Sequence, residues 1–439
     1  MLQDDEFSTI TEYNIVDNEE LGKTLNNLQS SHFTNLQVLR AKNCDEKLNI
    51  FLHILMKKSN KLEVLNIEQC KTLRFVFDVY HVTDDEVEDG KYFTEIKELK
   101  LIELAQLQHI WKVNKWIDDP ARMYGFRNMQ MIHIKSCPSL VVTLRDSVAK
   151  ELHQLNELKL EACESLEVVV YGWDERIIKF PALRKVEFKS LACLWWFCYR
   201  QLQFPSLKTL MIEKCPCLQY FAAGFATRDA SSITDGKSFF ELNELKLDSC
   251  DDLVVVMSSE TLQELGNLKK LFVSHCKSLE MVFKIRGEIS HSTKLLQELD
   301  ELILIDLPKL TLLINMEIAN FYENLQILQV KECKSLNWLP MSLMLTKMEI
   351  SDCEALENIM IIHKKEGTRR SANFSQLKDV TLENLKNLSV VFPSTSEFPS
   401  LEKLKVANCP SLMTFVDEES SKSKDHPEPC TSNYFFPKK

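Results

Sequence analysis

A twelve-residue pattern that recurs along most of the chain constrains the fold more than any other feature of this sequence. The pattern is L-x-x-L-x-L-x-x-C-x-x-L, as in the segment from Leu62 to Leu73. Fourteen copies begin at Leu36, Leu62, Ile96, Met129, Leu155, Leu183, Leu207, Leu242, Leu268, Leu299, Leu325, Leu345, Leu377 and Leu401. The copies start about 28 residues apart on average. One such unit cannot bury its own apolar face, so the chain must fold by stacking its units.

The ninth position of the pattern accounts for most of the cysteines. It is cysteine in ten copies: Cys44, Cys70, Cys137, Cys163, Cys215, Cys250, Cys276, Cys333, Cys353 and Cys409. The other four copies have Leu104, Leu191, Leu307 and Leu385 there. Cysteine is a small, weakly donating apolar residue, so we expect these ten to be reduced and buried. Cys193, Cys198 and Cys217 follow strands in apolar surroundings, where we expect unreactive thiols.

The alternation of apolar and polar residues within each copy predicts a short strand. The fourth and sixth positions are apolar and the third, fifth and seventh are mostly polar, which gives one buried face. An aromatic residue precedes most copies, as at Phe180, Phe204 and Phe398, and belongs to the segment that returns to the next strand. We therefore predict an α/β fold: a right-handed leucine-rich-repeat solenoid, or horseshoe, of about fourteen repeats. Its parallel inner sheet is roughly 60–70 Å long, and its convex side is irregular with 3₁₀ turns.

The two ends of the chain are less regular than the repeats. Residues 1–32 hold seven acids and one lysine and form an irregular acidic flank, residues 33–416 form the solenoid, and residues 417–439 form a disordered polar tail. The insertions at 78–90, 114–125, 227–237 and 363–370 are expected to be surface loops. No N-terminal cap is recognisable, so we expect Met1 to lie inside a longer natural protein.

The charge and hydropathy of the chain argue against several classes of partner. The 53 basic and 64 acidic residues give a net charge of −11, which disfavours binding to nucleic acid or anionic membranes. No apolar stretch reaches the ~18 residues of a membrane helix, and the N-terminus lacks a secretory signal. These features predict a soluble cytoplasmic protein without a nucleic-acid, membrane or small-molecule partner.

The patterns that carry chemistry are missing or incomplete. Gly236-Lys237-Ser238 is preceded five residues earlier by Ser231, so no phosphate-binding G-x-x-x-x-G-K-[ST] is present. The histidines form no H-E-x-x-H motif, and neither Cys215-Pro-Cys217 nor His275-Cys276 has a second pair at zinc spacing. We predict no enzyme activity, no cofactor and no metal.

Function in such a scaffold is expected on the outward strand positions, which face the concave side. Four apolar residues from three consecutive copies break the polar rule there: Phe272, Ile303, Ile305 and Ile327. An exposed apolar patch predicts a protein partner. Two alternatives are that a loop covers the patch, or that the copy containing Glu301-Leu-Ile-Leu-Ile305 is shifted by one residue. A second candidate is the basic loop of Lys364, Lys365, Arg369 and Arg370, which either contacts an acidic partner or is simply solvated.

The residue motifs of the repeat resemble those of one known family. The F-P-x-L start, the L-x-I-x-x-C-P-S-L core (Ile134 to Leu140 and Val406 to Leu412) and the L-x-x-V-F close are similar to the repeat region of plant coiled-coil-type nucleotide-binding leucine-rich-repeat disease-resistance proteins. The resemblance covers about residues 33–416. It implies a cytoplasmic domain that senses a pathogen effector or a guarded host protein and restrains the receptor's own nucleotide-binding module.

Two other interpretations remain open at this point. F-box proteins, the substrate-recruiting adaptors of ubiquitin ligases, also carry cysteine-containing repeats near this length. Their repeats usually continue C-x-x-I-T-D-x-G-L, whereas here the cysteine is followed by x-x-L-x-x-V-F. A truncated gene product without a separate role is the other possibility.

Overall fold

The computed structural model describes residues 10–27, 33–58, 61–78, 95–112, 126–172, 177–198, 202–219, 239, 241–258, 262, 265–285, 295–314, 323–361, 373–392 and 396–412. The chain divides into two compact units. Unit 1 comprises residues 1–218 and 222–239, and unit 2 comprises residues 219–221 and 240–439. Each unit is a stack of repeats with the same internal arrangement.

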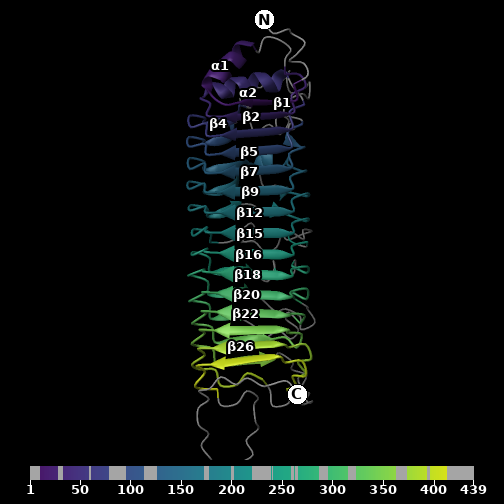
Figure 1. Ribbon diagram of the computed structural model, residues 1–439, viewed down its shortest axis with the longest axis vertical. Helices are drawn as coiled ribbons and strands as arrows, with labels where there is room; N and C mark the ends of the chain where they lie inside the picture. The colour runs from purple at the N-terminus through teal and green to yellow at the C-terminus, as the bar shows by residue number, and fades with distance from the viewer. Residues whose placement is uncertain are drawn as a thin grey trace, which may run out of the picture. The chain divides into compact units, whose positions relative to one another are not determined.

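The main sheet of unit 1 is parallel and takes one strand from each repeat (Figure 1). Its strands are β1 (Glu12–Ile15), β2 (Val38–Lys42), β3 (Val64–Glu68), β5 (Glu98–Ile102), β7 (Met131–Lys135), β9 (Glu157–Glu161), β12 (Lys185–Lys189) and β15 (Thr209–Glu213). Neighbours pair at equivalent repeat positions, as in Lys185 with Thr209. Strand β1 pairs with β2 from within the acidic flank, so the sheet begins one strand before the first copy of the pattern.

Unit 2 contains the equivalent strands of the later repeats. They are β16 (Glu244–Asp248), β18 (Lys270–Ser274), β20 (Glu301–Ile305), β22 (Ile327–Lys331), β24 (Lys347–Ser351), β26 (Asp379–Glu383) and β27 (Lys403–Ala407). All six neighbouring pairs are parallel and in register. The structure therefore confirms the predicted leucine-rich-repeat solenoid with its parallel sheet.

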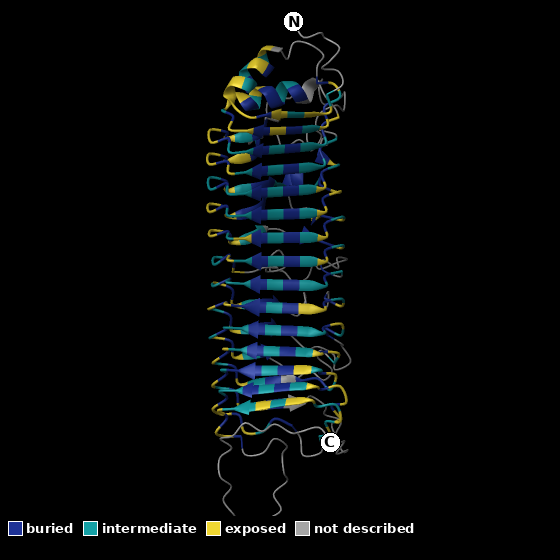
Figure 2. Ribbon diagram, viewed as in Figure 1, coloured by how far each residue is buried: buried dark blue, intermediate teal, exposed yellow. Residues whose placement is uncertain are grey.

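The strands alternate between a buried and an outward face, as the sequence pattern predicts. Figure 2 shows buried residues alternating with partly exposed ones along the strands. In β9, for example, Leu158 and Leu160 are fully buried, whereas Glu157, Lys159 and Glu161 lie on the outward face. The aromatic residues that precede the repeats stack between neighbouring coils: the rings of Phe180 and Phe204 are 5.7 Å apart and nearly parallel. Burial of these side chains supplies most of the stability.

In each of the fourteen repeats, the main-sheet strand is followed by a left-handed residue at the eighth position. All fourteen have φ between 50° and 57°, and none is glycine: Asn43, Gln69, Glu103, Ser136, Ala162, Ser190, Lys214, Ser249, His275, Asp306, Glu332, Asp352, Asn384 and Asn408. The N–H of this residue donates to the seventh-position carbonyl of the next coil, as from Ser190 to Glu213 at 2.8 Å. This bond and the stacked turn hold a conformation that L-residues otherwise avoid.

The ten cysteines of the ninth position are buried, as predicted. Each thiol lies 3.2–3.7 Å from the carbonyl oxygen of the residue two positions earlier, and donates to it. Cysteine thus fills the apolar space, and its thiol adds a hydrogen bond to a carbonyl that in most repeats also accepts the eighth-position N–H of the preceding coil. Burial raises the pKa of Cys215 to about 12.

The return side contains more regular structure than predicted. Short strands form small parallel sheets there. In unit 1 they are β4 (Phe75–Asp78) with β6 (His109–Lys112), β8 (Val142–Arg145) with β10 (Val168–Tyr171) and β13 (Trp196–Cys198), and β11 (Ile178–Lys179) with β14 (Leu202–Gln203). In unit 2 they are β17 (Val255–Ser258) with β19 (Met281–Lys284) and β21 (Leu312–Ile314), and β23 (Trp338–Met341) with β25 (Asn358–Ile361). The expected tight turns are present as single i→i+3 bonds, such as Leu166 N–H to the Cys163 carbonyl.

In the described part of the chain, three helices also depart from the repeat. They are α1 (Asn18–Asn27), α2 (Lys47–Lys58) and α4 (Asp146–Ala149). Helix α2 replaces an irregular return segment because Leu48, Phe51, Leu52 and Leu55 are spaced for one helical face, and all four are buried. Helices α1 and α2 lie at the β1 end of unit 1 (Figure 1).

Candidate functional site

The outward face of the main sheet in unit 1 is largely a lattice of ion pairs. Lys185 Nζ on β12 lies 2.7 Å from Glu187 and 3.5 Å from Glu157, and Lys159 Nζ lies 3.3 Å from Glu187. Burial raises the pKa of Glu187, but hydrogen bonds from Lys185 and Lys159 outweigh this and leave the pKa below its usual value. On β9 and β12 these charges therefore satisfy one another.

Four apolar residues replace such charges on the outward face of unit 2. Phe272 on β18 and Ile303 on β20 are direct neighbours in the sheet. Ile305 lies two residues further along β20, and Ile327 is on β22. All four are half-buried and face outward. We call Phe272, Ile303, Ile305 and Ile327 the apolar cluster.

The register of β20 excludes one of the alternatives for this cluster. Leu302 and Leu304 are fully buried and pair with the buried Leu271 and Val273 of β18. A shift by one residue would bury Ile303 and expose these leucines. The repeat is therefore not shifted, and the isoleucines are outward residues.

Charged and polar side chains surround the apolar cluster. The Lys246 ammonium lies 5.4 Å from the centre of the Phe272 ring, within the range of a cation–π contact. Lys270 Nζ lies 3.0 Å from Glu301, and Gln329 donates to Glu349 at 3.3 Å. The cluster is thus apolar at its centre and polar at its rim, which is the usual composition of a protein-binding patch.

A carboxylate row borders the cluster where the strands end. Asp306, Glu332 and Asp352 occupy the left-handed eighth position of three consecutive coils. Among the described residues Asp306 and Glu332 take part in no ion pair. This side of the cluster therefore presents two carboxylates without an ion-pair partner in that part of the chain, and Lys277 interacts with Asp306 only at longer range.

A serine, a histidine and an aspartate meet at one edge of this face without forming a catalytic triad. Ser274 Oγ donates to Asp248 at 2.5 Å, and His275 Nδ1 lies 2.7 Å from the same carboxylate oxygen. Burial raises the pKa of Asp248, but the hydrogen bonds from Ser274 and His275 outweigh burial and leave the pKa below its usual value. A nucleophilic serine must donate to the imidazole instead. This network is thus suited to fixing the strand end rather than to activating Ser274.

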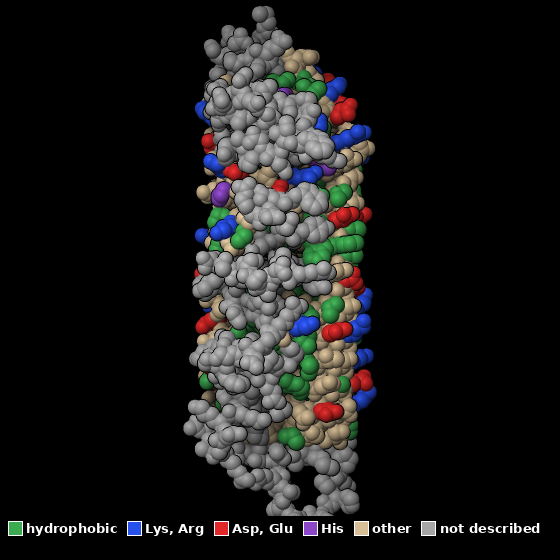
Figure 3. Space-filling view, turned by 180° about the vertical axis from the view of Figure 1, so that it is seen from behind, with side chains coloured by type: hydrophobic (Ala, Val, Ile, Leu, Met, Phe, Trp, Pro, Cys, Tyr) green, Lys and Arg blue, Asp and Glu red, His purple; other side chains and the backbone are tan. Residues whose placement is uncertain are grey.

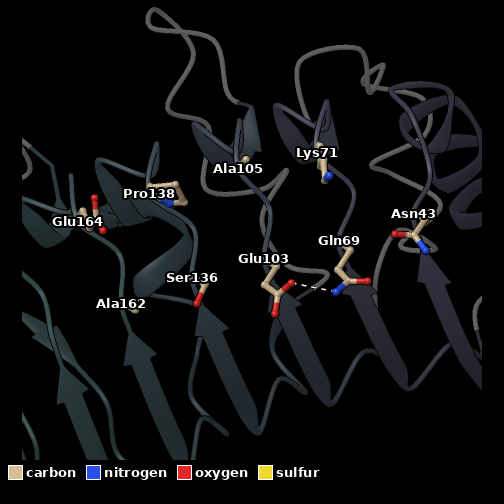
Figure 4. Close-up of a pocket in the computed structure, with 9 residues that line it drawn as sticks. All are labelled: Asn43, Gln69, Lys71, Glu103, Ala105, Ser136, Pro138, Ala162 and Glu164. Atoms are coloured by element: carbon tan, nitrogen blue, oxygen red, sulfur yellow. Dashed lines mark hydrogen bonds between the residues drawn. The ribbon is translucent and has the colours of Figure 1, made fainter.

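A shallow hollow of about 520 Å³ lies along the strand ends of unit 1 (Figure 4). Its lining comes from the eighth and tenth positions of consecutive repeats: Asn43, Gln69, Lys71, Glu103, Ala105, Ser136, Pro138, Ala162 and Glu164. Small side chains such as Ala105 and Ala162 create the hollow, and Gln69 donates to Glu103 at 2.9 Å inside it. It offers polar contacts, but its charged residues are few and mixed in sign.

The sequence analysis did not identify some apolar residues that lie at least partly on the surface. Val38 and Val64, for example, are partly exposed outward neighbours on β2 and β3. On the side of the molecule away from the main sheet, hydrophobic side chains are exposed between charged ones (Figure 3), and Trp195 is 51% exposed.

The prediction that Cys193 lies in apolar surroundings is wrong, because its turn projects into solvent. The side chain of Cys198 and the basic loop of Lys364, Lys365, Arg369 and Arg370 lie outside the described residues.

The described part of the chain also bears on metal binding and membrane insertion. In that part, no three or more His, Cys, Asp or Glu side chains are grouped so that they could hold a metal ion. The helices described there include none with the length and apolar character needed to cross a membrane.

Comparison with known proteins places this arrangement in a family. The family described as plant disease resistance protein RPS2-like, leucine-rich repeats, matches residues 9–164, 229–344 and 318–423. These matches cover most of the chain, and the first one includes β1. The protein belongs to this family of leucine-rich-repeat regions.

Individual relatives agree with the family. An Arabidopsis thaliana protein named as a disease resistance protein, At4g19050, is 26% identical over 159 residues, which are 35% of this chain and 12% of that protein. Disease resistance protein SUMM2 of the same plant is 25% identical over 181 residues, which are 39% of this chain and 18% of that protein. The matched regions span less than a fifth of either relative.

Solved structures show a more distant likeness. The leucine-rich-repeat protein LIC12759 of Leptospira interrogans is 16% identical, with a TM-score of 0.40 and coverage of 90% of this chain and 84% of that one. An internalin of Listeria monocytogenes is 12% identical, with a TM-score of 0.33 and coverage of 96% and 90%. Neither is similar enough to transfer a function.

Proposed function

We propose that this chain is the partner-recognition region of a cytoplasmic plant immune receptor, and that it binds protein through the apolar cluster of unit 2. The partner is a pathogen effector, a guarded host protein or the receptor's own nucleotide-binding module, which the repeats would restrain. Family membership supports the receptor assignment, and it lends no support to the F-box alternative. The observation that carries the proposal is the direct pairing of Phe272 with Ile303 at a repeat position that is polar or charged in every other repeat of unit 2.

The chemistry of the cluster defines the kind of contact it makes. Removing the apolar side chains of the cluster from water favours association with a partner that offers a matching apolar surface. The unpaired Asp306 and Glu332 favour a partner that carries basic residues beside its apolar contact. Such a surface binds without catalysis and needs no cofactor.

The test compares two double variants of the full chain in leaf extract. Phe272→Asp with Ile303→Asp places two carboxylates in the cluster. Lys159→Asp with Glu187→Asp makes the same change at the same repeat positions of unit 1. We expect the cluster variant to keep its thermal unfolding transition. The amount of each specific partner protein that precipitates with it should fall by at least about tenfold, whereas the wild type and the control variant retain that partner. The measurement is quantitative mass spectrometry of co-immunoprecipitated proteins.

The opposite result is equally clear. If the folded cluster variant retains the same proteins in the same amounts as the wild type, the cluster is not the binding surface. If the cluster variant and the control variant lose the same proteins equally, binding depends on general charge rather than on these apolar residues.

A further inference from the structure

Two cysteines lie outside the buried cysteine position and share a different one. Cys193 follows Leu191 by two residues, and Cys217 follows Cys215 by two, so both occupy the eleventh position of the repeat. Of the fourteen copies only these two, which are consecutive, have cysteine there. Cys193 is exposed and Cys217 is partly exposed. Both residues belong to unit 1.

The backbones that carry the two cysteines are held side by side. Strands β12 and β15 pair in register up to Lys189 and Glu213, and the Ser190 N–H continues the pairing to the Glu213 carbonyl at 2.8 Å. Both turns then close with the same i→i+3 bond, from Leu194 to Leu191 and from Leu218 to Cys215. Equivalent residues of neighbouring coils are therefore about 4.8 Å apart. That separation lies within the roughly 4.4–6.8 Å between the Cα atoms of disulfide-bonded cysteines.

Side chains at the eleventh position point toward the neighbouring coil. Ser139, Ser335 and Ser411 occupy this position in other repeats. Their hydroxyls donate to the tenth-position carbonyls of the preceding coils, Ala105, Pro308 and Lys386, at 2.6–2.7 Å. The same direction takes the Cys217 side chain toward the turn that holds Cys193. Since Cys193 is exposed, rotation about its Cα–Cβ bond can bring its sulfur to meet Cys217.

We propose that Cys193 and Cys217 form a surface dithiol that small-molecule disulfides of the glutathione class oxidise to an intrachain disulfide. The Cys193 thiolate attacks one sulfur of the small disulfide, whose S–S bond breaks and releases one small thiolate. The Cys217 thiolate then attacks the Cys193 sulfur, and the second small thiolate leaves. The two cysteine protons end on the two released thiols, and an excess of those thiols reverses the reaction.

The buried cysteines do not compete in this reaction. Cys44 and Cys70 also occupy equivalent positions in neighbouring coils, but both are buried. A hydrogen bond with Cys70, together with burial, raises the pKa of the Cys44 thiol. The thiolate is the attacking species and must reach the oxidant, so the exposed pair reacts first.

The experiment is peptide mapping of the full chain after treatment with oxidised glutathione. Cys198→Ser and Cys430→Ser are present in every sample, so that the read-out reports on the proposed pair. We expect tryptic peptides 190–200 and 215–228 to be joined, to carry no glutathione, and to separate on reduction. With Cys193→Ser or Cys217→Ser, the remaining cysteine should instead carry one glutathione group.

Two results would overturn the proposal. One is an intact pair that takes up two glutathione groups without a cross-link. The other is a cross-link between these peptides that persists after Cys217→Ser, which would assign it to Cys215. Should a serine variant unfold, the chain that keeps both Cys193 and Cys217 decides the question alone. After oxidation its peptides 190–200 and 215–228 must be joined and free of glutathione, and separate peptides refute the bridge.

A matched pair tests the geometric part of the argument. Ser139 and Ser165 are the eleventh-position residues of the two preceding neighbouring repeats. Introducing cysteine at both, with Cys193 and Cys217 changed to serine, should give the same cross-link. Failure here, while the chain remains folded, would show that neighbouring eleventh positions are too far apart to be bridged.

Discussion

The outward faces of β9–β12 and of β18–β20 have the same backbone arrangement and different side chains. Both pairs of strands are parallel and join equivalent repeat positions. The fifth position pairs Lys159 with Glu187 in unit 1 and Phe272 with Ile303 in unit 2. Lys159 and Glu187 form an ion pair that water also reaches, whereas Phe272 and Ile303 place two apolar side chains side by side.

This difference shows that the fold does not require an apolar residue at the fifth position. The ion-paired stretch shows that polar residues at the fifth position are compatible with the sheet, because its core lies on the opposite face. Phe272 and Ile303 are therefore not required for folding. A half-exposed apolar pair that the fold does not need is the feature expected of a binding surface.

The largest expected loss of stability tests whether one face of β20 belongs to the core and the other does not. Leu304→Ala removes a fully buried side chain, and we expect it to lower the free energy of unfolding of unit 2 by about 2–5 kcal/mol. Its neighbour Ile303 faces outward, so Ile303→Ala should cost about 1 kcal/mol or less. Urea unfolding of both variants makes the comparison. Equal losses would mean that the cluster belongs to the core.

An intermediate effect tests whether the backbone is the same in the two units. Ala162 in unit 1 and Asp306 in unit 2 both have a left-handed φ, of 53° and 50°. A β-branched side chain is strained in that conformation, so Ala162→Val and Asp306→Val should each destabilise their unit by about 1–2 kcal/mol. Thermal unfolding measures both. A loss in one unit only would contradict the equivalence of the two turns.

The smallest effect concerns the ion pairs. Lys185→Ala removes a half-exposed partner of Glu157 and Glu187, and such pairs stabilise by about 0–1 kcal/mol. The pKa of Glu187 is lower in the folded chain than its ordinary value of 4.5. Its contribution is therefore present above that value and is lost as the pH falls through the folded pKa. The variant should approach wild-type stability at acid pH, and unfolding at pH 7 and pH 3 checks this. A difference that grows at acid pH would contradict it.

The regular part of this structure could be predicted from the sequence because it depends on local alternation. A period of two assigned Leu302 and Leu304 to the core and Ile303 to the outward face, and the structure confirms both. The same pattern placed the ten cysteines inside. Helix α2 departs from the repeat, but it too could have been predicted, because its apolar residues are spaced for one face of a helix.

The turns could not be predicted in the same way. The left-handed eighth position has no sequence signature, since Asn, Glu, Ser, Ala and His all occupy it. Its conformation is held by a hydrogen bond to the next coil, and no single repeat contains that bond. Likewise, the hydrogen-bond acceptor of each buried thiol becomes apparent only when the bend is in place.

The repeat, the strands and the face to which each residue belongs can be predicted from the sequence, because they follow from spacing along one strand. Which residues from different coils meet depends on how the coils stack. Stacking brings Lys185 to Glu157 and Lys246 to the ring of Phe272, and it places Cys193 and Cys217 on neighbouring turns. The reason is that exposure and partnership depend on the stacking of coils about 4.8 Å apart, and residues from neighbouring coils are about 28 positions apart in the chain.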